Sequence, residues 1–298
     1  MKIVFFATPD FAIPSLNALI DAGHEITGVV TTPDKEQGRG RKLESSPVKK
    51  FAVEKGFHVI TPLSLRDEKF HHELKTLGAD LFVVVAFKIL PGDVFTIPRY
   101  GSFNLHGSLL PKYRGAAPIQ WALINGDTLT GLTTFALADK VDTGNIYLKK
   151  EVEILPEDNF ETLHDRMSEI GAGLVTDTVK LIESGNFKLM PQDDSQASPA
   201  PKITKEISMI SWSKSPVEIH NLIRGLSPFP GAQFILDGKV TKIYKGNPHD
   251  KIYPEGEFVI NGNRAFIGCR GGSYEILELK MEGKKQLGIE EFLRGYRG

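Results

Sequence analysis

The first 184 residues alternate between short apolar runs and segments in which apolar residues recur at helical spacing. Residues 2–8 predict a strand, and apolar positions over residues 11–22 predict the helix that follows it. Further apolar runs at 24–32 and 57–61 predict strands, with a helix over 48–55 between them. Strands that alternate with helices in this way predict a parallel sheet.

Residues 80–87 are apolar almost throughout, as expected for a strand that is covered on both faces and lies centrally in the sheet. Shorter and more polar strands are expected at 102–109, 131–137 and 145–154. We expect the loops after them to lie on one rim of the sheet. A long helix over residues 160–183 ends this region.

The remaining residues have a different pattern. Residues 185–203 are rich in Pro, Ser, Asp and Gln and lack periodicity, which is typical of a linker. Beyond them, a helix over 215–225 and short runs separated by Gly and Asn predict a small antiparallel, OB-like β-barrel. The sequence therefore predicts an α/β protein with a Rossmann-like domain over 1–184, a linker, and a β-barrel domain over 204–298.

The composition is that of a globular protein, with 41% hydrophobic and 24% charged residues. The single cysteine, Cys269, cannot form an internal disulfide, which suits a reducing compartment. Apolar runs such as residues 81–87 are far shorter than the roughly 20 residues of a membrane span, and no targeting segment is visible. We therefore expect a cytoplasmic protein that does not enter a membrane.

The formal net charge is only -1, but the charges are unevenly distributed. Residues 1–203 hold more acidic than basic side chains, whereas residues 204–298 hold 14 Lys and Arg against 11 Asp and Glu. A second basic segment, residues 35–50, has six Lys and Arg against two Glu. Such segments are commonly solvated surface, but they also suit a polyanionic partner.

Several cofactor motifs are missing. No G-x-G-x-x-G follows the first strand, and no G-x-x-x-x-G-K-[ST] occurs, which argues against a nucleotide cofactor. The sequence also lacks H-E-x-x-H and any cluster of Cys and His, so we expect no metal site.

Polar residues gather in two other places. Asn104 and His106 are two positions apart in a predicted strand and therefore share one side of it. Asp142 lies in a loop closed by Gly144. A lone strand histidine is more often structural than catalytic, and an Asp in such a loop is more often an ordinary turn residue. If both loops lie on the same rim of a parallel sheet, however, they converge where such sheets bind ligands.

Together these three side chains suit acyl transfer without a covalent intermediate. Asn104 can donate a hydrogen bond to a developing oxyanion, and His106 can exchange a proton near neutral pH. Asp142 can orient the imidazole and tune its basicity.

Residues 103–127, FNLHGSLLPKYRGAAPIQWALINGD, together with VDTG at 141–144, resemble the formyltransferases that use 10-formyltetrahydrofolate. The resemblance covers nearly the whole chain. It includes ATPDFA near the start, KITKEISMISW after the predicted linker, LIRGLSPFPGA, and the end of the chain.

This resemblance implies transfer of a formyl group from 10-formyltetrahydrofolate to the α-amino group of methionine on initiator tRNA, a step of translation initiation, without a metal. It implies that Asn104, His106 and Asp142 are catalytic and that Ser108, Leu109, Leu110 and Pro111 bind the folate. The pterin pocket would involve Phe87 and Leu90 in AFKILP, which departs from the family's more usual Tyr-Gly-Leu-Ile-Leu-Pro and is one residue shorter.

The resemblance also implies contacts with tRNA. Arg39, Arg41 and Lys42 of the basic segment would contact the phosphates of the acceptor arm. Lys239, Lys242 and Lys245 of the barrel would contact the backbone largely independently of sequence, although charge alone is equally compatible with a solvated surface. No obligatory protein partner is implied.

Four other functions share parts of this pattern. A glycinamide ribonucleotide formyltransferase or a formyltetrahydrofolate hydrolase leaves residues 204–298 unexplained. A sugar-amine formyltransferase can carry a C-terminal barrel, but it does not account for the basic segment and KITKEISMISW. An inactive α/β scaffold that binds RNA has no need of all three polar side chains.

Overall fold

The structure is a computed structural model of the chain and describes all residues except 38–41 and 297–298. The chain forms two compact units, each built from several segments. The first unit contains Met1–Gly115, Gly131–Val152 and His164–Pro199, and the second contains Ala116–Thr130, Glu153–Leu163 and Ala200–Gly298.

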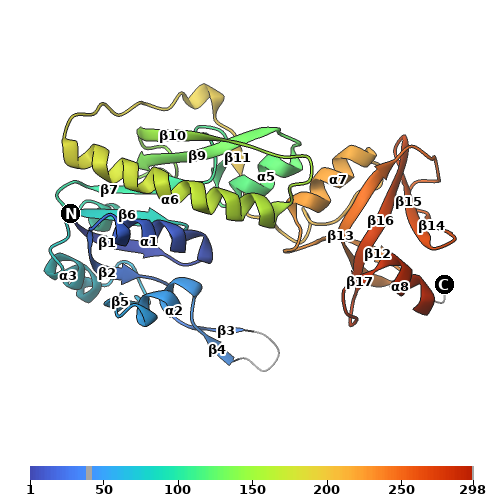
Figure 1. The fold of residues 1–298 in the computed structure, drawn as a ribbon, viewed down its shortest axis with the longest axis horizontal. Coiled ribbons are helices and arrows are strands. Elements are labelled where there is room, and N and C mark those ends of the chain that lie inside the picture. Colours follow the sequence, from blue (N-terminus) through green and yellow to red (C-terminus); the bar gives the residue numbers. More distant parts are fainter. Residues whose placement is uncertain (38–41, 297–298) are drawn as a thin grey trace. The chain divides into compact units, whose positions relative to one another are not determined.

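The first unit is built on a seven-stranded sheet with the order β10-β9-β7-β6-β1-β2-β5 (Figure 1). Its strands are β1 (Lys2–Ala7), β2 (Glu25–Val30), β5 (Val59–Ile60), β6 (Leu81–Val85), β7 (Ser102–His106), β9 (Leu129–Ala136) and β10 (Ile146–Glu153). As predicted, the apolar strand β6 is central and fully buried. The five strands from β7 to β5 are parallel, whereas β9 is antiparallel to β7. The expected parallel sheet is therefore confirmed for those five strands and is wrong for β9.

Helices pack on this sheet because their apolar stripes match its buried faces. The helical segments of the unit are η1 (Asp10–Ala12), α1 (Ile13–Asp21), α2 (Pro47–Glu54), α3 (Glu68–Thr76), α4 (Gly92–Phe95) and α6 (Phe160–Ser184). Phe70, Leu74 and Val94 from α3 and α4 join Phe82 and Val84 of β6 in one apolar cluster. Helix α6 approaches β7 so closely that a Cβ on Gly171 would meet Leu105 Cδ2 at 2.8 Å.

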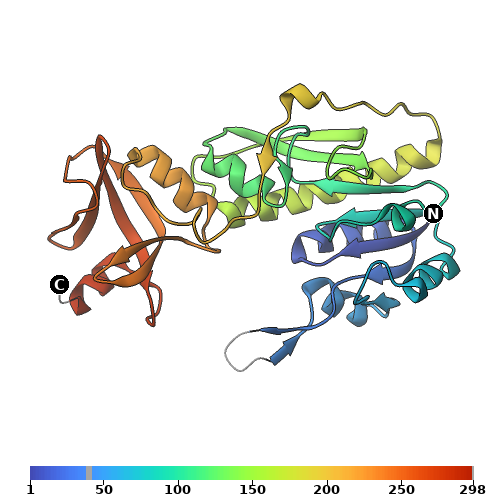
Figure 2. The ribbon, with the colours of Figure 1, turned by 180° about the vertical axis from the view of Figure 1, so that it is seen from behind.

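A β-hairpin, β3 (Lys35–Gln37) and β4 (Lys42–Glu44), follows β2 and is visible in Figure 2. The strands are antiparallel, with Lys35 opposite Glu44 and Glu36 opposite Leu43. The charge pattern of residues 35–50 predicts a flexible basic loop, whereas the structure forms these two strands within it. Lys35 and Glu44 are opposite charges that face one another, which favours the pairing of the two strands.

The second unit contains an antiparallel sheet with the order β12-β13-β16-β15-β14, and β17 pairs with β16. Its elements are α5 (Pro118–Ile124), α7 (Pro216–Gly225), β12 (Ala232–Leu236), β13 (Lys239–His249), β14 (Phe258–Asn261), β15 (Arg264–Cys269), β16 (Gly272–Met281), β17 (Leu287–Gly288) and α8 (Ile289–Gly295). The arrangement is consistent with the predicted barrel-like domain, although no pairing among the described strands closes a ring.

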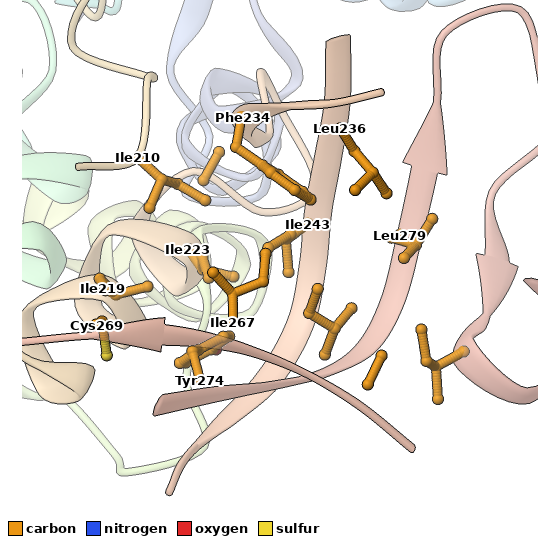
Figure 3. Packing of buried hydrophobic residues seen from close by; sticks show 14 of the residues in the cluster. Ile210, Ile219, Ile223, Phe234, Leu236, Ile243, Ile267, Cys269, Tyr274 and Leu279 are labelled. Carbon is orange, nitrogen blue, oxygen red and sulfur yellow. The ribbon is translucent and has the colours of Figure 1, made fainter. Parts of the chain in front are cut away.

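The core of the second unit is shown in Figure 3. Ile219 and Ile223 of α7 face Ile243, Ile267 and other apolar side chains from four strands, all of them buried. Helix α7 begins at a capping box in which Ser215 and Glu218 satisfy each other's backbone N–H groups. Cys269 lies in this core, as expected for a small apolar side chain.

Residues 185–199, which the sequence predicts as part of a linker, belong to the first unit. They contain η2 (Asp194–Gln196), and β11 (Pro199–Ala200) pairs with β8 (Arg114–Gly115). Met190 also forms a bridge with Ile146. A segment of linker composition therefore still finds backbone hydrogen-bond partners in the first unit.

No described helix is both long enough and apolar enough to cross a membrane.

Candidate active site

His106 ends strand β7, and its imidazole is buried, with 6% of the side chain exposed. Its Nε2 lies 2.8 Å from the carbonyl oxygen of Tyr113. Because a carbonyl oxygen can only accept, Nε2 must carry the proton in this hydrogen bond. The neutral ring therefore leaves Nδ1 unprotonated, with its lone pair available to take a proton.

The carboxylate of Asp142 faces that unprotonated nitrogen. Its Oδ2 lies 3.8 Å from His106 Nδ1 and accepts a hydrogen bond of 2.9 Å from the backbone N–H of Gly115. The distance to Nδ1 is too long for a hydrogen bond but suits an ion pair once the ring is protonated. The hydrogen bond of the imidazole thus goes to the Tyr113 carbonyl, and the Asp142 carboxylate faces Nδ1.

Asp142 reaches His106 by a different route from the one expected. Because β9 is antiparallel to β7, its last residue Ala136 lies opposite Phe103, and Thr133 lies opposite His106. The loop after β9 therefore begins away from His106 and has to fold back toward it over the sheet. Gly144 makes this path possible, because a Cβ there would lie 1.7 Å from the backbone oxygen of Ala136.

Asn104 lies two residues before His106 on the same face of β7. It is half-buried, and its side chain makes no hydrogen bond to any residue that the structure describes. Its partner in the register on β6 is Val84, and on β9 it is Phe135. An amide without a protein partner beside a base is a suitable donor for an oxyanion.

The loop after His106 is held by hydrogen bonds rather than by regular structure. The Ser108 hydroxyl donates to Lys112 O at 2.6 Å, and the buried Thr133 hydroxyl donates to Ser108 O at 2.7 Å. Leu110 is fully buried against Phe135 and Ile146. Of the four residues predicted to bind folate, Ser108 and Leu110 thus hold the loop in place, while Leu109 and Pro111 are half-buried.

An apolar wall lies next to Asn104. Val84, its neighbour on β6, belongs to the same cluster as the buried Leu90, and half-buried Phe87 and Leu137 pack against that cluster. The ring of Phe87 contacts Phe6 edge-on, with 5.7 Å between ring centroids. Phe87 and Leu90, the predicted pterin-pocket residues, therefore both pack in the apolar cluster that includes Val84.

The basic residues predicted to bind tRNA differ in whether the structure describes them, in exposure and in hydrogen bonding. Arg39 and Arg41 lie outside the described residues, as does the side chain of Lys42, the first residue of β4. Lys239 and Lys245 are exposed on β13. Lys242 is half-buried, and its ammonium donates to Pro230 O at 2.6 Å.

Three contacts of the site were not predicted from the sequence. The Tyr113 carbonyl and the Gly115 N–H are backbone groups, which side-chain chemistry does not reveal, although both residues fall within the quoted motif. The third is Gln192, whose Nε2 donates to the carbonyls of Asp142 and Gly144 at 2.9 and 2.8 Å. It lies in a segment of linker composition, where nothing in the pattern singles it out.

Within the part of the chain that the structure describes, no group of three or more His, Cys, Asp or Glu side chains is arranged to hold a metal ion.

Comparison with family models matches residues 1–179 to the family described as formyl transferase and residues 202–297 to the formyl transferase C-terminal domain. The methionyl-tRNA formyltransferase of Caldanaerobacter subterraneus subsp. tengcongensis is 44% identical over 99% of this chain and 97% of its own length. That of Geobacter sulfurreducens is 42% identical over 100% of this chain and 94% of its own length.

Solved structures share the fold at lower identity. WlaRD, a sugar 3N-formyl transferase solved in the presence of dTDP and 5-N-formyl-THF, has a TM-score of 0.69 at 21% identity, covering 96% of this chain and 99% of that one. HypX from Aquifex aeolicus in complex with tetrahydrofolic acid has a TM-score of 0.67 at 18% identity, covering 98% of this chain and 47% of that one.

Proposed function

The chain belongs to the formyl transferase family, and we infer from this that it transfers the formyl group of 10-formyltetrahydrofolate to the α-amino group of methionyl-tRNA. The initiator tRNA is the proposed acceptor, so that the product serves translation initiation in the cytoplasm. We propose that the enzyme works without an obligatory protein partner.

The observation that supports the chemistry best is the set of contacts made by the two ring nitrogens of His106. Its Nε2–H is committed to the Tyr113 carbonyl, so Nδ1 is the nitrogen that can accept a proton, and it faces Asp142. A proton taken up by Nδ1 would be stabilised by the carboxylate at 3.8 Å. His106 is therefore the proposed proton carrier, and Asp142 stabilises its charged form.

In the proposed reaction the neutral α-amine attacks the formyl carbon and forms a new C–N bond. The carbonyl oxygen of the formyl group becomes an oxyanion, to which the Asn104 amide donates a hydrogen bond. His106 accepts a proton from the attacking nitrogen. As the bond between the formyl carbon and N10 breaks, that proton passes to N10 of the departing tetrahydrofolate, so atoms and charge balance.

The donor is a substrate with an aromatic pterin, and the apolar wall formed by Phe87, Leu90 and Leu137 suits it. We propose that this wall and the loop residues Ser108, Leu109, Leu110 and Pro111 bind the folate. Leu109 and Pro111 are the half-buried members of that loop and are therefore the ones available for contact.

We propose that the catalytic chemistry resides in a domain over residues 1–184 and that residues 204–298 contact the RNA. Exposed Lys239 and Lys245 and half-buried Lys242 would meet phosphates on the second unit. Arg39, Arg41 and Lys42 would meet the acceptor arm. A positively charged surface of this kind accounts for affinity without reading sequence.

Formyl transfer from 10-formyltetrahydrofolate should be measured with charged initiator tRNA, with free methionine and with a dTDP-linked amino sugar. Transfer to the tRNA at a kcat/KM far above the other acceptors supports the proposal, whereas preference for the sugar contradicts it. His106→Ala and Asp142→Ala should each lower kcat by about 100-fold or more. If both variants keep wild-type turnover, the proposed catalytic roles are wrong even if the substrate is right.

A further inference from the structure

The side chain of Gln192 uses its whole amide to connect the 185–199 segment to the loop that carries Asp142. Nε2 donates both of its hydrogens, to Asp142 O at 2.9 Å and to Gly144 O at 2.8 Å. Oε1 accepts from Arg114 Nε at 3.1 Å and from Arg114 Nη2 at 2.7 Å. A Gln with both donors and both acceptor positions used is held in one orientation.

Arg114 is itself well anchored. Its side chain is 16% exposed, and Nη2 also donates to Asp194 Oδ1 at 2.7 Å. Its backbone N–H donates to Ser198 O at 2.8 Å, so both its side chain and its main chain are tied to the 185–199 segment. The planar guanidinium holds its Nε and Nη2 N–H groups in a fixed fork, and both donate to the same oxygen.

The position of Arg114 in the sequence connects the Gln192–Arg114 pair to both proposed acid–base side chains. The residue before it, Tyr113, accepts the hydrogen bond from His106. The residue after it, Gly115, donates to the Asp142 carboxylate. A shift of Arg114 would therefore disturb the partner of the imidazole and the partner of the carboxylate together.

The loop at Asp142 requires such support, because its backbone is in an uncommon conformation. Asp142 has φ of +54°, in the left-handed region that side chains other than glycine rarely adopt. Conformations of this kind persist when the surrounding structure holds them, and they cluster at functional sites. The two hydrogen bonds from Gln192 hold the carbonyls of residue 142 and of the residue two positions later.

We propose that Gln192, held by Arg114, is a positioning residue for Asp142. This inference rests on the proposed function, because it assigns Gln192 the task of keeping the Asp142 carboxylate at the distance from His106 that the acid–base step needs. Gln192 does not contact the reacting atoms; it acts through the loop. Displacing a catalytic group by about 1 Å can cost about 100-fold in rate.

Gln192→Glu provides a test with a pH signature. The glutamate has nearly the same shape and still accepts from Arg114, but its ionised carboxylate would face two carbonyl oxygens and repel them. When protonated it regains one donor. We expect kcat about 10-fold or more below wild type at pH 8, and a ratio of variant to wild-type kcat that rises as the pH is lowered to 6. The KM for the folate should change little.

Two further variants complete the design. Gln192→Met keeps the length but cannot donate, so it should lose a similar amount of kcat with a ratio that does not depend on pH. Gln196→Glu is the matched control, because this exposed glutamine in the same segment hydrogen-bonds only with Asp193 among the described residues. It should leave kcat unchanged. All assays are run well below the unfolding temperature of each variant, measured by calorimetry.

Wild-type kcat in Gln192→Met overturns the proposal, as does a loss in Gln192→Glu whose ratio to wild type is independent of pH. An equal loss of kcat in Gln196→Glu also overturns the proposal, because the loss would then come from any added negative charge in the 185–199 segment. Asp142→Asn separates this inference from the proposed function. Wild-type activity in Asp142→Asn means that the carboxylate is not catalytic. An inactive Asp142→Asn together with a fully active Gln192→Met refutes only the role of Gln192.

Discussion

Two histidines of this chain are assigned different roles by their partners. His106 donates from Nε2 to a carbonyl and leaves Nδ1 facing a carboxylate. His220 is half-buried in the second unit, where its Nδ1 lies 3.1 Å from the Tyr274 hydroxyl. Burial, followed by the nearby positive charge of Arg224, lowers the pKa of His220 below its ordinary value. The environment of His220 therefore favours a ring that stays neutral.

Asn104→Ala should lower kcat by about 100-fold to 1000-fold, because it removes the proposed oxyanion donor. The unfolding temperature should change little, since the Asn104 side chain is half-buried and makes no hydrogen bond within the described residues. Steady-state kinetics with methionyl-tRNA and calorimetry measure the two effects. Retention of full activity would remove Asn104 from the catalytic set.

The lowered pKa of His220 predicts that the second unit loses stability in acid. The unfolded chain binds a proton near pH 6.5, and the folded chain does so only at lower pH, so the stability present above pH 6.5 is lost as the pH falls through the folded pKa of His220. Chemical unfolding followed by tryptophan fluorescence reports this unit, because both tryptophans, Trp121 and Trp212, belong to it.

His220→Gln should make the free energy of unfolding less dependent on pH between 7.5 and 5.5 than it is in the wild type. His72→Gln, at an exposed histidine of α3, is the control and should keep the wild-type dependence. Equal slopes for His220→Gln and the wild type would show that His220 does not contribute to acid sensitivity.

At the scale of secondary-structure elements, the antiparallel strand β9 decides how the site is assembled. In a fully parallel sheet, the loops after β7 and β9 would leave from the same rim. Here β9 runs the other way, and the loop at 137–145 returns by packing its backbone against the end of the same strand. The Ala136 N–H donates to Asn145 O at 2.9 Å, which closes this loop.

Gly144→Ala should destabilise the first unit by about 3 kcal/mol or more, since the new methyl group would overlap backbone that has no room to move. Activity should fall as well, because Gln192 binds the carbonyl of this residue. Gly173→Ala is the matched control. It lies exposed on helix α6 with open space around its Cβ position, and it should stabilise the protein by about 0.5–1 kcal/mol. Thermal unfolding measures the change in stability of both variants. Similar changes in Gly144→Ala and Gly173→Ala would contradict the packing argument.

At the scale of the whole molecule, the distribution of basic residues matters more for an RNA substrate than the net charge does. The chain carries only -1 overall, but its last 95 residues are net basic, and the hairpin after β2 is basic too. The two family models together, and relatives at 42–44% identity, span these regions as well as Asn104, His106 and Asp142.

The logarithm of the binding constant for initiator tRNA should fall linearly as the logarithm of the salt concentration rises. Lys239→Ala and Lys245→Ala should each reduce the magnitude of that slope by about 1. Lys242→Ala should reduce it less, because the Lys242 ammonium is already engaged by Pro230 O. Lys180→Ala on helix α6 serves as the control. Fluorescence anisotropy over a salt series measures the slopes, and an unchanged slope in the Lys239 and Lys245 variants would exclude them as phosphate contacts.

Several properties of this protein follow from the sequence alone because they depend on local patterns. Apolar runs and helical spacing located most of the strands and helices, and the unbroken apolar run at residues 81–87 identified the central strand. The motif around Asn104 and His106 and the D-T-G loop indicated the family, which the family models and relatives confirm. The catalytic roles of these residues remain predictions.

Only the tertiary structure decided how the site is held together. Four features depend on backbone groups brought together from distant parts of the chain. They are the direction of β9, the carbonyl bound by His106, the N–H bound by Asp142, and the carbonyls bound by Gln192. A backbone carbonyl or N–H is the same chemical group at nearly every residue, so its partner leaves no trace in the order of side chains. The sequence determines which chemistry is present, and long-range hydrogen bonding determines how that chemistry is aligned.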